Sequence, residues 1–376
     1  MLLTAPPSAP GRRPWTGLRC ELHDAVDRAW WDGLVAVHPG ATIFQAGCWA
    51  DFLAEYLGRR PFFFVARDGD GNVLATLLGF VRGLWEDHVF ERPGGRAIGP
   101  LLRRALPVAS WRYGPLWHTP APAPELMREC AAALVRGLQG RGVYAVEGAV
   151  SLAPPPSPPS GDPFERVLPG ATVGATLLVD VTADPDLLWR ALKPSARKAV
   201  QSARRHGVEV RRVTDLEELR AYRAFFLAHN VERAGRFYSF RRLERMWKHL
   251  HPCGAVEIFA ARRRDELLAG LGVWRFGGTC IEFSARQSRA CREARIYAPD
   301  LIRWEIIRWA HDQGLRWYDL AGVSPDPRDD KERGIRQFKE KWGGAYWELM
   351  AREGILSPWR HQLVEAIRRS VGLLRR

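Results

Sequence analysis

The chain has 376 residues, more than one hydrophobic core usually accommodates, and its 46% apolar content with 16 tryptophans suffices for two domains. Lys and Arg number 56 against 42 Asp and Glu, and nearly all of the net charge of +14 lies in residues 186–250, at +9, and residues 360–376, at +4. Such concentrated charge favours a polyanionic partner, which could be RNA, a nucleotide-activated precursor or an anionic membrane face, unless arginine merely serves as the solubilising residue.

The cysteines and the apolar runs exclude several classes of protein. The six cysteines have no short paired spacing, so neither a zinc cluster nor a dense disulfide framework is indicated, and we expect no metal. The first residues lack the apolar core of a secretion signal, and no apolar run approaches the roughly 18 residues of a spanning helix. We therefore expect a cytoplasmic protein, with at most peripheral contact at the inner membrane face.

The first half of the chain is expected to form one α/β unit. Residues 1–16 are rich in Pro, Ala and Arg, which predicts disorder, and a stiff proline-rich linker is predicted over residues 152–170. Between them lies a first unit over residues 17–151, in which an Asp-Gly turn joins two apolar strands. Its expected elements are a helix over 48–57, strands over 62–67 and 73–80, a helix over 123–138 and a strand over 143–147.

The second unit, residues 171–352, repeats this order of elements. Both hairpins share Phe-x-Ala-Arg before the turn and Leu-Ala-x-Leu after it, which favours a duplicated domain. A capping box is expected at Thr214 to Glu217, with Leu216, Leu219, Tyr222 and Phe226 facing the core. The expected elements are helices over 194–207 and from 216 to 229, strands over 256–262 and 267–274, a helix over 299–313, a strand over 317–320, and a basic amphipathic helix over 353–376.

The helix expected over residues 194–207 is basic along most of its surface. Only a narrow stripe of Ala196, Val200 and Ala203 is apolar, so most of the helix should be exposed. Several cations on one helix can bind phosphates, although an ordinary solvated face has the same pattern. The candidate phosphate-binding residues are Lys193, Arg197, Lys198 and Arg204.

The stretch from Arg316 to Leu349 is typical of an anion-binding site. A short apolar strand ends at Asp319, a charged loop follows, and a brief cationic helix stops before two glycines. Backbone amides at the start of that helix could bind an oxyanion or phosphate, while Lys339 and Lys341 add full charges. The alternative is a simple connector whose lysines face water.

Three blocks of sequence resemble the FemABX family, which transfers amino acids from aminoacyl-tRNA to peptidoglycan stem peptides. They run from Leu188 to Val210, from Ile281 to Trp304, and from Tyr318 to Gly344. The resemblance implies an α/β fold of two tandem GNAT-like domains with mixed, largely antiparallel sheets. It also implies that aminoacyl-tRNA and a UDP-linked or lipid-linked peptidoglycan precursor are the partners.

The resemblance further implies roles for individual residues. Phe338 and Lys339 match the reaction centre, while Arg233 and Phe237 are the nearest matches to residues that hold the precursor. Tyr318 and Trp304, which lie within the matching blocks, are added as substrate-binding residues, and Lys341 as a phosphate contact.

Attack of an amine on an activated acyl group requires a hydrogen-bond donor for the oxyanion and a base for the amine proton. A fixed donor aimed at the developing oxyanion is typically worth about 3 kcal/mol, and Lys339 is the candidate donor. The amine must also lose a proton, and Asp319 at its strand end is the candidate base, although it could equally cap the following loop.

Two other classes compete with an aminoacyltransferase. GNAT enzymes usually bind acyl-coenzyme A through a glycine-rich turn, but residues 286–295 contain no glycine, so we expect no such cofactor. An N-acyltransferase that uses another acyl carrier stays open. A non-catalytic RNA- or membrane-binding module could use the tail, where apolar residues line one face among arginines; the same pattern describes a helix docked on its own domain. Those residues are Leu363, Ile367, Val371 and Leu374.

Overall fold

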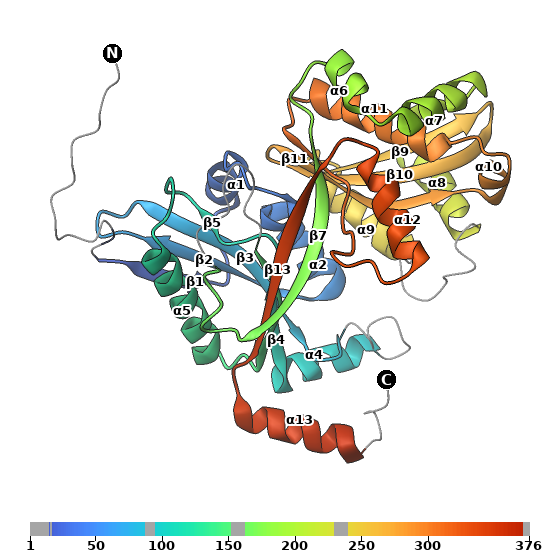
Figure 1. Ribbon diagram of the computed structural model, residues 1–376. Helices are drawn as coiled ribbons and strands as arrows, with labels where there is room; N and C mark the ends of the chain where they lie inside the picture. The colour runs from blue at the N-terminus through green and yellow to red at the C-terminus, as the bar shows by residue number, and fades with distance from the viewer. Residues whose placement is uncertain (1–14, 16, 87–94, 152–161, 229–239, 371–376) are drawn as a thin grey trace, which may run out of the picture.

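The computed structural model describes residue 15 and residues 17–86, 95–151, 162–228 and 240–370. The predicted N-terminal tail, apart from Trp15, most of the proline-rich linker, and the candidate residues Arg233 and Phe237 lie outside these residues, as do Val371 and Leu374. Within the described residues, a single mixed sheet runs through both halves of the molecule (Figure 1). Its strand order is β1-β2-β3-β4-β6-β13-β7-β12-β11-β10-β9-β8, and β5 pairs with β3.

The first unit begins with an edge strand and ends with β6. Its elements are β1 (Arg19–His23), α1 (Arg28–Ala36), a short 3-10 helix (Ile43–Gln45), α2 (Gly47–Leu57), β2 (Arg60–Arg67), β3 (Val73–Gly83), α4 (Gly95–Ala105), β4 (Pro107–Trp111), β5 (Leu116–Trp117), α5 (Pro124–Gly140) and β6 (Ala145–Ser151).

The second unit begins with a long strand. Its elements are β7 (Gly170–Asp180), α6 (Pro185–Ala191), α7 (Pro194–Arg205), β8 (Glu209–Arg212), α8 (Leu216–Ala228), α9 (Phe240–Leu250), β9 (Val256–Arg263), β10 (Glu266–Phe276), β11 (Thr279–Gln287), α10 (Arg289–Glu293), α11 (Ala298–Asp312), β12 (Trp317–Asp319), α12 (Asp330–Glu340) and β13 (Ala345–Ile355), and α13 (Pro358–Ser370) follows it.

The two units share one strand pattern, as the repeated hairpin predicts. In each, an antiparallel hairpin follows a helix, β2 with β3 and β9 with β10. In each, a parallel pair of strands then closes the series, β4 with β6 and β11 with β12. The mixed, largely antiparallel α/β architecture of two similar units is therefore confirmed.

Strands β7 and β13 join the two units. β13 pairs antiparallel with β7 from Ala345 to Glu353 and with β6 of the first unit on its other edge. Figure 1 shows the pair as a long ribbon that crosses the middle of the molecule. β13 ends at Ile355, so the first residues assigned to the C-terminal helix are strand, and α13 begins only at Pro358.

A shared hydrophobic core also links the units. Trp274 of β10 contacts Phe44 and Trp49 of the first unit, with ring centroids 5.9 and 5.4 Å apart, and it stacks on Phe283 at 4.4 Å. Aromatic pairs of this kind add to the free energy gained by burying their area. Two further cores lie within single units, one between α5 and the first-unit strands and one between α7, α11 and the second-unit strands.

Two local expectations are corrected. Residues 162–169 are not an extended linker, because Phe164 and Leu168 are fully buried in the core of the first unit. The cap of α8 lies one residue later than expected: the Asp215 carboxylate accepts from the amides of Glu217 and Glu218 at 2.9 and 2.8 Å. Aspartate is as good an N-cap as threonine, and this register leaves Leu216 exposed.

Candidate functional site

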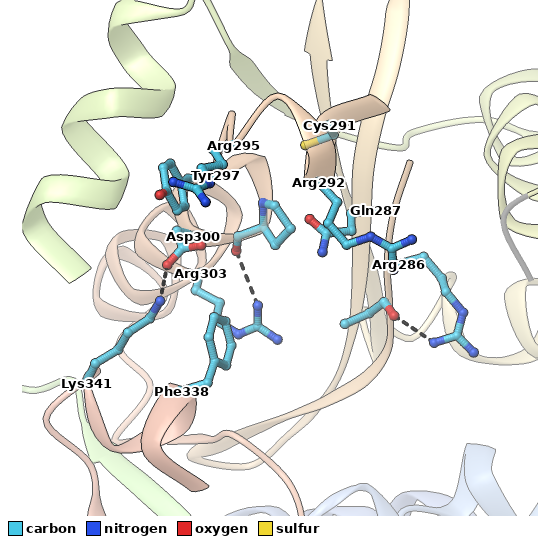
Figure 2. A pocket seen from close by; sticks show the side chains of 12 residues that line it. Arg286, Gln287, Cys291, Arg292, Arg295, Tyr297, Asp300, Arg303, Phe338 and Lys341 are labelled. Carbon is cyan, nitrogen blue, oxygen red and sulfur yellow. Dashed lines mark hydrogen bonds and ion pairs between the residues drawn. The ribbon is translucent and has the colours of Figure 1, made fainter. Parts of the chain in front are cut away.

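A cavity of about 400 Å³ opens in the second unit where β11 ends and α10 and α11 begin (Figure 2). We call it the β11–α11 cavity. Pro299 sits in the first turn of α11, where its missing amide costs nothing, and Gly314 ends the helix region at a φ of 66°. These signals fix the helix whose first turns form one wall.

The walls of the β11–α11 cavity carry five cationic side chains and one acidic one. The cations are Arg286, Arg292, Arg295, Arg303 and Lys341, and the acid is Asp300. Arg292 and Arg295 are exposed and form no ion pair with any residue in the described ranges. The cavity therefore presents a local excess of positive charge that suits phosphate or carboxylate groups.

A buried ion pair supports one wall. The Arg303 guanidinium makes a two-pronged contact with Glu282, both N–H···O distances being 2.8 Å, and the Tyr318 hydroxyl donates to the same carboxylate. Both charged side chains are almost fully buried. Burial, followed by the Glu282 charge, raises the pKa of Tyr318 well above its usual value, so the phenol stays protonated.

Phe338 of α12 lies between two cations of the cavity. Its ring centroid is 4.8 Å from the Arg303 guanidinium carbon and 4.0 Å from Lys341 Nζ, and the Lys341 ammonium also pairs with Asp300. Figure 2 shows the Phe338 ring beside Arg303, with Lys341 reaching across to Asp300. The ring is held by cation–π contacts on a wall that a ligand can reach.

Lys339 and Asp319 lie outside the lining of that cavity, at the junction of β12 with the loop that follows. The Lys339 ammonium donates to the carbonyls of Ala321 and Gly322, at 3.0 and 2.8 Å. The Asp319 carboxylate accepts from Thr176 Oγ1 and, at 2.7 Å, from the amide of Ala321. We call this arrangement the Lys339–Asp319 junction; it fixes the turn at Ala321, whose φ of 61° is left-handed.

Burial shifts both charged groups of the junction toward neutrality. It raises the pKa of Asp319 to about 6, although Thr176, the Ala321 amide and Lys339 act in the opposite direction. Burial also lowers the pKa of Lys339. Burial and then the Asp319 charge raise the pKa of Tyr113 in the first unit, which indicates that the junction faces that unit.

The start of α12 is not the anion site that the sequence suggested. The Asp329 side chain caps the helix by accepting from the Glu332 amide at 2.7 Å, and Asp330 and Glu332 occupy the first turn. Three carboxylates already complement the positive end of the helix, so it would repel a further anion. The two lysines lie at the opposite end of α12.

The basic helix α7 is exposed, with its apolar stripe buried as expected. Arg197 donates to the carbonyls of Arg190 and Leu192, and Arg204 pairs with Glu305 at 3.0 Å. Both arginines are therefore engaged in contacts within the fold. Lys193 caps the helix: its amide donates to the carbonyl of Lys341, and its ammonium lies 3.7 Å from Glu340. Lys198 is exposed. Among the candidate phosphate-binding residues, Lys193 lies beside the β11–α11 cavity, because its amide is bonded to the carbonyl of Lys341, which lines that cavity.

Two of the proposed substrate-binding residues are misassigned. Trp304 is buried in the core against Trp189, with ring centroids 4.9 Å apart, and Tyr318 of β12 is fully buried in the same core. Neither lines the β11–α11 cavity. Both were chosen because they lie in matching blocks, and aromatic residues in such blocks also build cores. Arg233 and Phe237 lie outside the described residues.

Phe338 and Lys341, which the sequence put forward as site residues, line the cavity, but sequence reasoning missed its arginines and Asp300. The segment of residues 286–295, which contains Arg292 and Arg295, was considered only for its lack of glycine. Its four arginines in ten residues were the pattern that could have indicated an anion-binding site. Glu282 and Arg303 carried no local signal, because their pairing joins β11 to α11 across 21 residues. Asp300 carried none either, because its partner Lys341 lies 41 residues further along the chain.

Comparison with known proteins agrees with this architecture. Residues 191–340 match the family model of the acetyltransferase (GNAT) domain. FemX shares the fold with a TM-score of 0.70 at 16% identity, over 92% of this chain and all of that one. A protein of unknown function from Bacteroides thetaiotaomicron gives 0.52 at 12% identity, covering 89% and 99% of the two chains, and L-PGS from Bacillus licheniformis gives 0.50 at 12%, covering 87% and 91%. A search of curated proteins by sequence gave no match.

The fold and the domain match define the class of the protein. The chain is an acyltransferase built from two GNAT-like units. Its fold is similar to that of FemX, which shares the arrangement over its whole length. An acyltransferase is an enzyme, which decides against the purely non-catalytic module.

Proposed function

We propose that the chain transfers an aminoacyl group from aminoacyl-tRNA to an amine of a peptidoglycan precursor stem peptide. The observation that carries the proposal is the β11–α11 cavity, whose lining holds five cations, two of which, Arg303 and Lys341, contact the ring of Phe338. The single-stranded end of a charged tRNA offers phosphates and bases that can stack, which suits cations placed beside Phe338. The FemX-like fold supports the same assignment.

Within this proposal the exposed arginines bind the donor and the junction serves the reaction. Arg292 and Arg295 contact phosphates of the tRNA end, and the Phe338 ring supports its terminal base or sugar. An ammonium has three N–H donors, and the two hydrogen bonds from Lys339 to backbone carbonyls leave one for an oxyanion. Asp319, with a pKa of about 6, is poised to take a proton near neutral pH.

A GNAT-type N-acyltransferase that uses acyl-coenzyme A is the second candidate. The acetyltransferase family match over residues 191–340 favours it. The pyrophosphate of coenzyme A is also an anion that arginines can bind, but the turn from Gln287 to Tyr297 has no glycine to let the backbone approach it closely.

One assay separates the two donors. Purified protein is incubated with a UDP-linked stem peptide and either labelled aminoacyl-tRNA or labelled acetyl-coenzyme A, and the products are identified by mass spectrometry. We expect an amino acid on the stem peptide only with aminoacyl-tRNA. An acetylated product, or calorimetric binding of acetyl-coenzyme A that saturates, would support the second candidate. The Lys341→Met variant should lose most transfer, whereas Lys331→Met, on the exposed side of α12, should keep it.

A further inference from the structure

A second cavity, of about 500 Å³, lies between α4 and the start of α13 in the first unit, far along the chain from the β11–α11 cavity. We call it the α4–α13 pocket. Five arginines line it, with no acidic side chain in the lining: Arg60, Arg103, Arg104, Arg141 and Arg360.

Not all of these arginines are used within the fold. Arg103 pairs with the buried Glu86 at 2.5 Å, and Arg141 pairs with Asp24 at 2.7 Å. Arg360 donates to the carbonyl of Gly142 at 2.6 Å, which fixes the start of α13 over the pocket. Arg60 and Arg104 are exposed and form no ion pair with any residue in the described part of the chain. The pocket therefore holds uncompensated positive charge.

The helices beside the pocket carry exposed apolar side chains. On α13, Trp359, Leu363 and Ile367 are spaced four residues apart and are 66%, 53% and 40% exposed. On α4, Ile98 and Leu101 are 46% and 68% exposed. Residues three or four apart lie on one face of a helix, so each helix presents an apolar stripe to solvent.

The opposite face of α13 is docked on the first unit. Val364 is fully buried against Leu84, Leu106 and Tyr144, and the Tyr144 hydroxyl lies 3.0 Å from His361 Nδ1. Figure 1 shows α13 beneath α4 at one end of the first unit, away from the helices of the second unit. Because docking uses the Val364 side, the stripe of Trp359, Leu363 and Ile367 stays exposed in the described fold, with the guanidinium of the adjacent Arg360 5.1 Å from the centroid of the Trp359 ring.

We propose that the α4–α13 pocket and the two stripes form a site for an anionic membrane surface, in which the arginines bind lipid phosphates and the stripes enter the interface. Interfacial helices combine an apolar face with arginines in this way, and tryptophan favours the boundary between headgroups and chains. The uncompensated arginines of the α4–α13 pocket favour a surface that carries phosphate groups over an apolar groove on another protein. Where the sequence predicts contact by the C-terminal helix alone, the structure adds α4 and a headgroup pocket. The inference does not depend on which acyl donor the enzyme uses.

Vesicle sedimentation tests the proposal with the full chain. The probes are vesicles of phosphatidylcholine alone and vesicles that also contain phosphatidylglycerol. We expect strong binding only to the second kind, and binding that weakens with added salt. The Arg60→Gln/Arg104→Gln variant should bind about thirty-fold more weakly, from the contribution of two arginines near an anionic surface. Trp359→Ser/Leu363→Ser should also lose binding.

The control removes the same charge elsewhere on the first unit. Arg19 and Arg166 are exposed and line neither cavity, so Arg19→Gln/Arg166→Gln should bind as the unchanged chain does. Equal losses in both arginine variants would overturn the proposal, because they would reflect net charge alone. Equal binding to both kinds of vesicle would overturn it too, as would calorimetric binding of inorganic phosphate at the pocket without any vesicle binding.

Discussion

Lys339 holds the loop after β12 and is the residue on which the proposed chemistry depends most. Its ammonium bonds to two backbone carbonyls, so one side chain both fixes the turn at Ala321 and keeps a positive charge beside Asp319. The sequence suggested Lys339 only as a donor to the developing oxyanion. The structural role matters for experiments, because loss of activity on substitution could arise from either.

For Lys339→Met we expect transfer to fall by about 100- to 1,000-fold in kcat, as when one fixed oxyanion donor is removed. We also expect a loss of about 1.5–3 kcal/mol in the free energy of unfolding, because hydrogen bonds from a charged group are removed. Kinetics and urea unfolding measure the two effects separately. Lys331→Met, at the exposed start of the same helix, should change neither. Full activity in Lys339→Met would remove this residue from the mechanism.

Asp319 should make stability depend on pH in a defined direction. Its pKa in the folded state, about 6, exceeds the ordinary value of 3.8, so the folded state holds the proton more tightly. Its contribution is therefore complete below about pH 4 and is lost as the pH rises through 6, amounting to about 3 kcal/mol.

The Asp319→Asn variant lacks this titration. Between pH 4 and pH 7 the unfolding free energy of the variant, relative to that of the unchanged chain, should rise by about 2.4 kcal/mol, as measured by urea unfolding at each pH. If Asp319 is the base, the same variant should lose transfer above pH 6. A stability difference that stays constant with pH would show that the carboxylate is not held in this way.

At the scale of elements, the walls of the candidate site depend on contacts between β11 and α11. The sequence predicts α11, because Pro299 and Gly314 mark the ends of the helix region, but β11 was not among the expected strands. It could not predict that Glu282 and Arg303 meet, since that pairing depends on how the helix crosses the sheet. The same limit explains why the cavity arginines were missed and why Trp304 and Tyr318 were misassigned.

The start of α12 shows another limit of the sequence. Lysines and a helix boundary in one short stretch favoured an anion site, but the lysines lie at the C-terminal end and the carboxylates at the N-terminal end. That arrangement is the one that stabilises a helix dipole. By contrast, the repeated hairpins and the basic helix α7 were predictable, because turn residues and periodicity are local properties.

Removing one partner of the buried pair should weaken the contact between β11 and α11. Glu282→Ala leaves the Arg303 guanidinium buried without its carboxylate, which typically costs about 3–5 kcal/mol. The midpoint of urea unfolding should fall accordingly. Glu293→Ala, which removes an exposed pair with Arg289 in the neighbouring helix, should leave the midpoint of urea unfolding almost unchanged. Similar small losses in both variants would mean that the pair is solvated.

At the scale of the whole molecule, the two units are joined by the β7–β13 ribbon and by the aromatic core around Trp274. The sequence predicted two units but not this connection. No local sequence pattern distinguishes a strand that pairs with strands of both units. The connection keeps the Lys339–Asp319 junction facing the first unit.

This shared structure predicts one cooperative unfolding transition. Trp274→Ala should lower the stability of both units together, by about 3–5 kcal/mol, because its ring contacts both. Circular dichroism and tryptophan fluorescence should give coincident transitions before and after the change. Two separate transitions in the unchanged chain would mean that the units fold independently.

The most direct test of the proposed function is the salt dependence of binding to aminoacyl-tRNA. For the Arg292→Gln/Arg295→Gln variant we expect weaker binding and a plot of log K against log salt that is shallower by about 1.4, from two lost contacts to single-stranded phosphates. The control variant Arg19→Gln/Arg166→Gln should keep the original slope. A slope unchanged in the Arg292→Gln/Arg295→Gln variant would contradict the assignment of the β11–α11 cavity to the tRNA end.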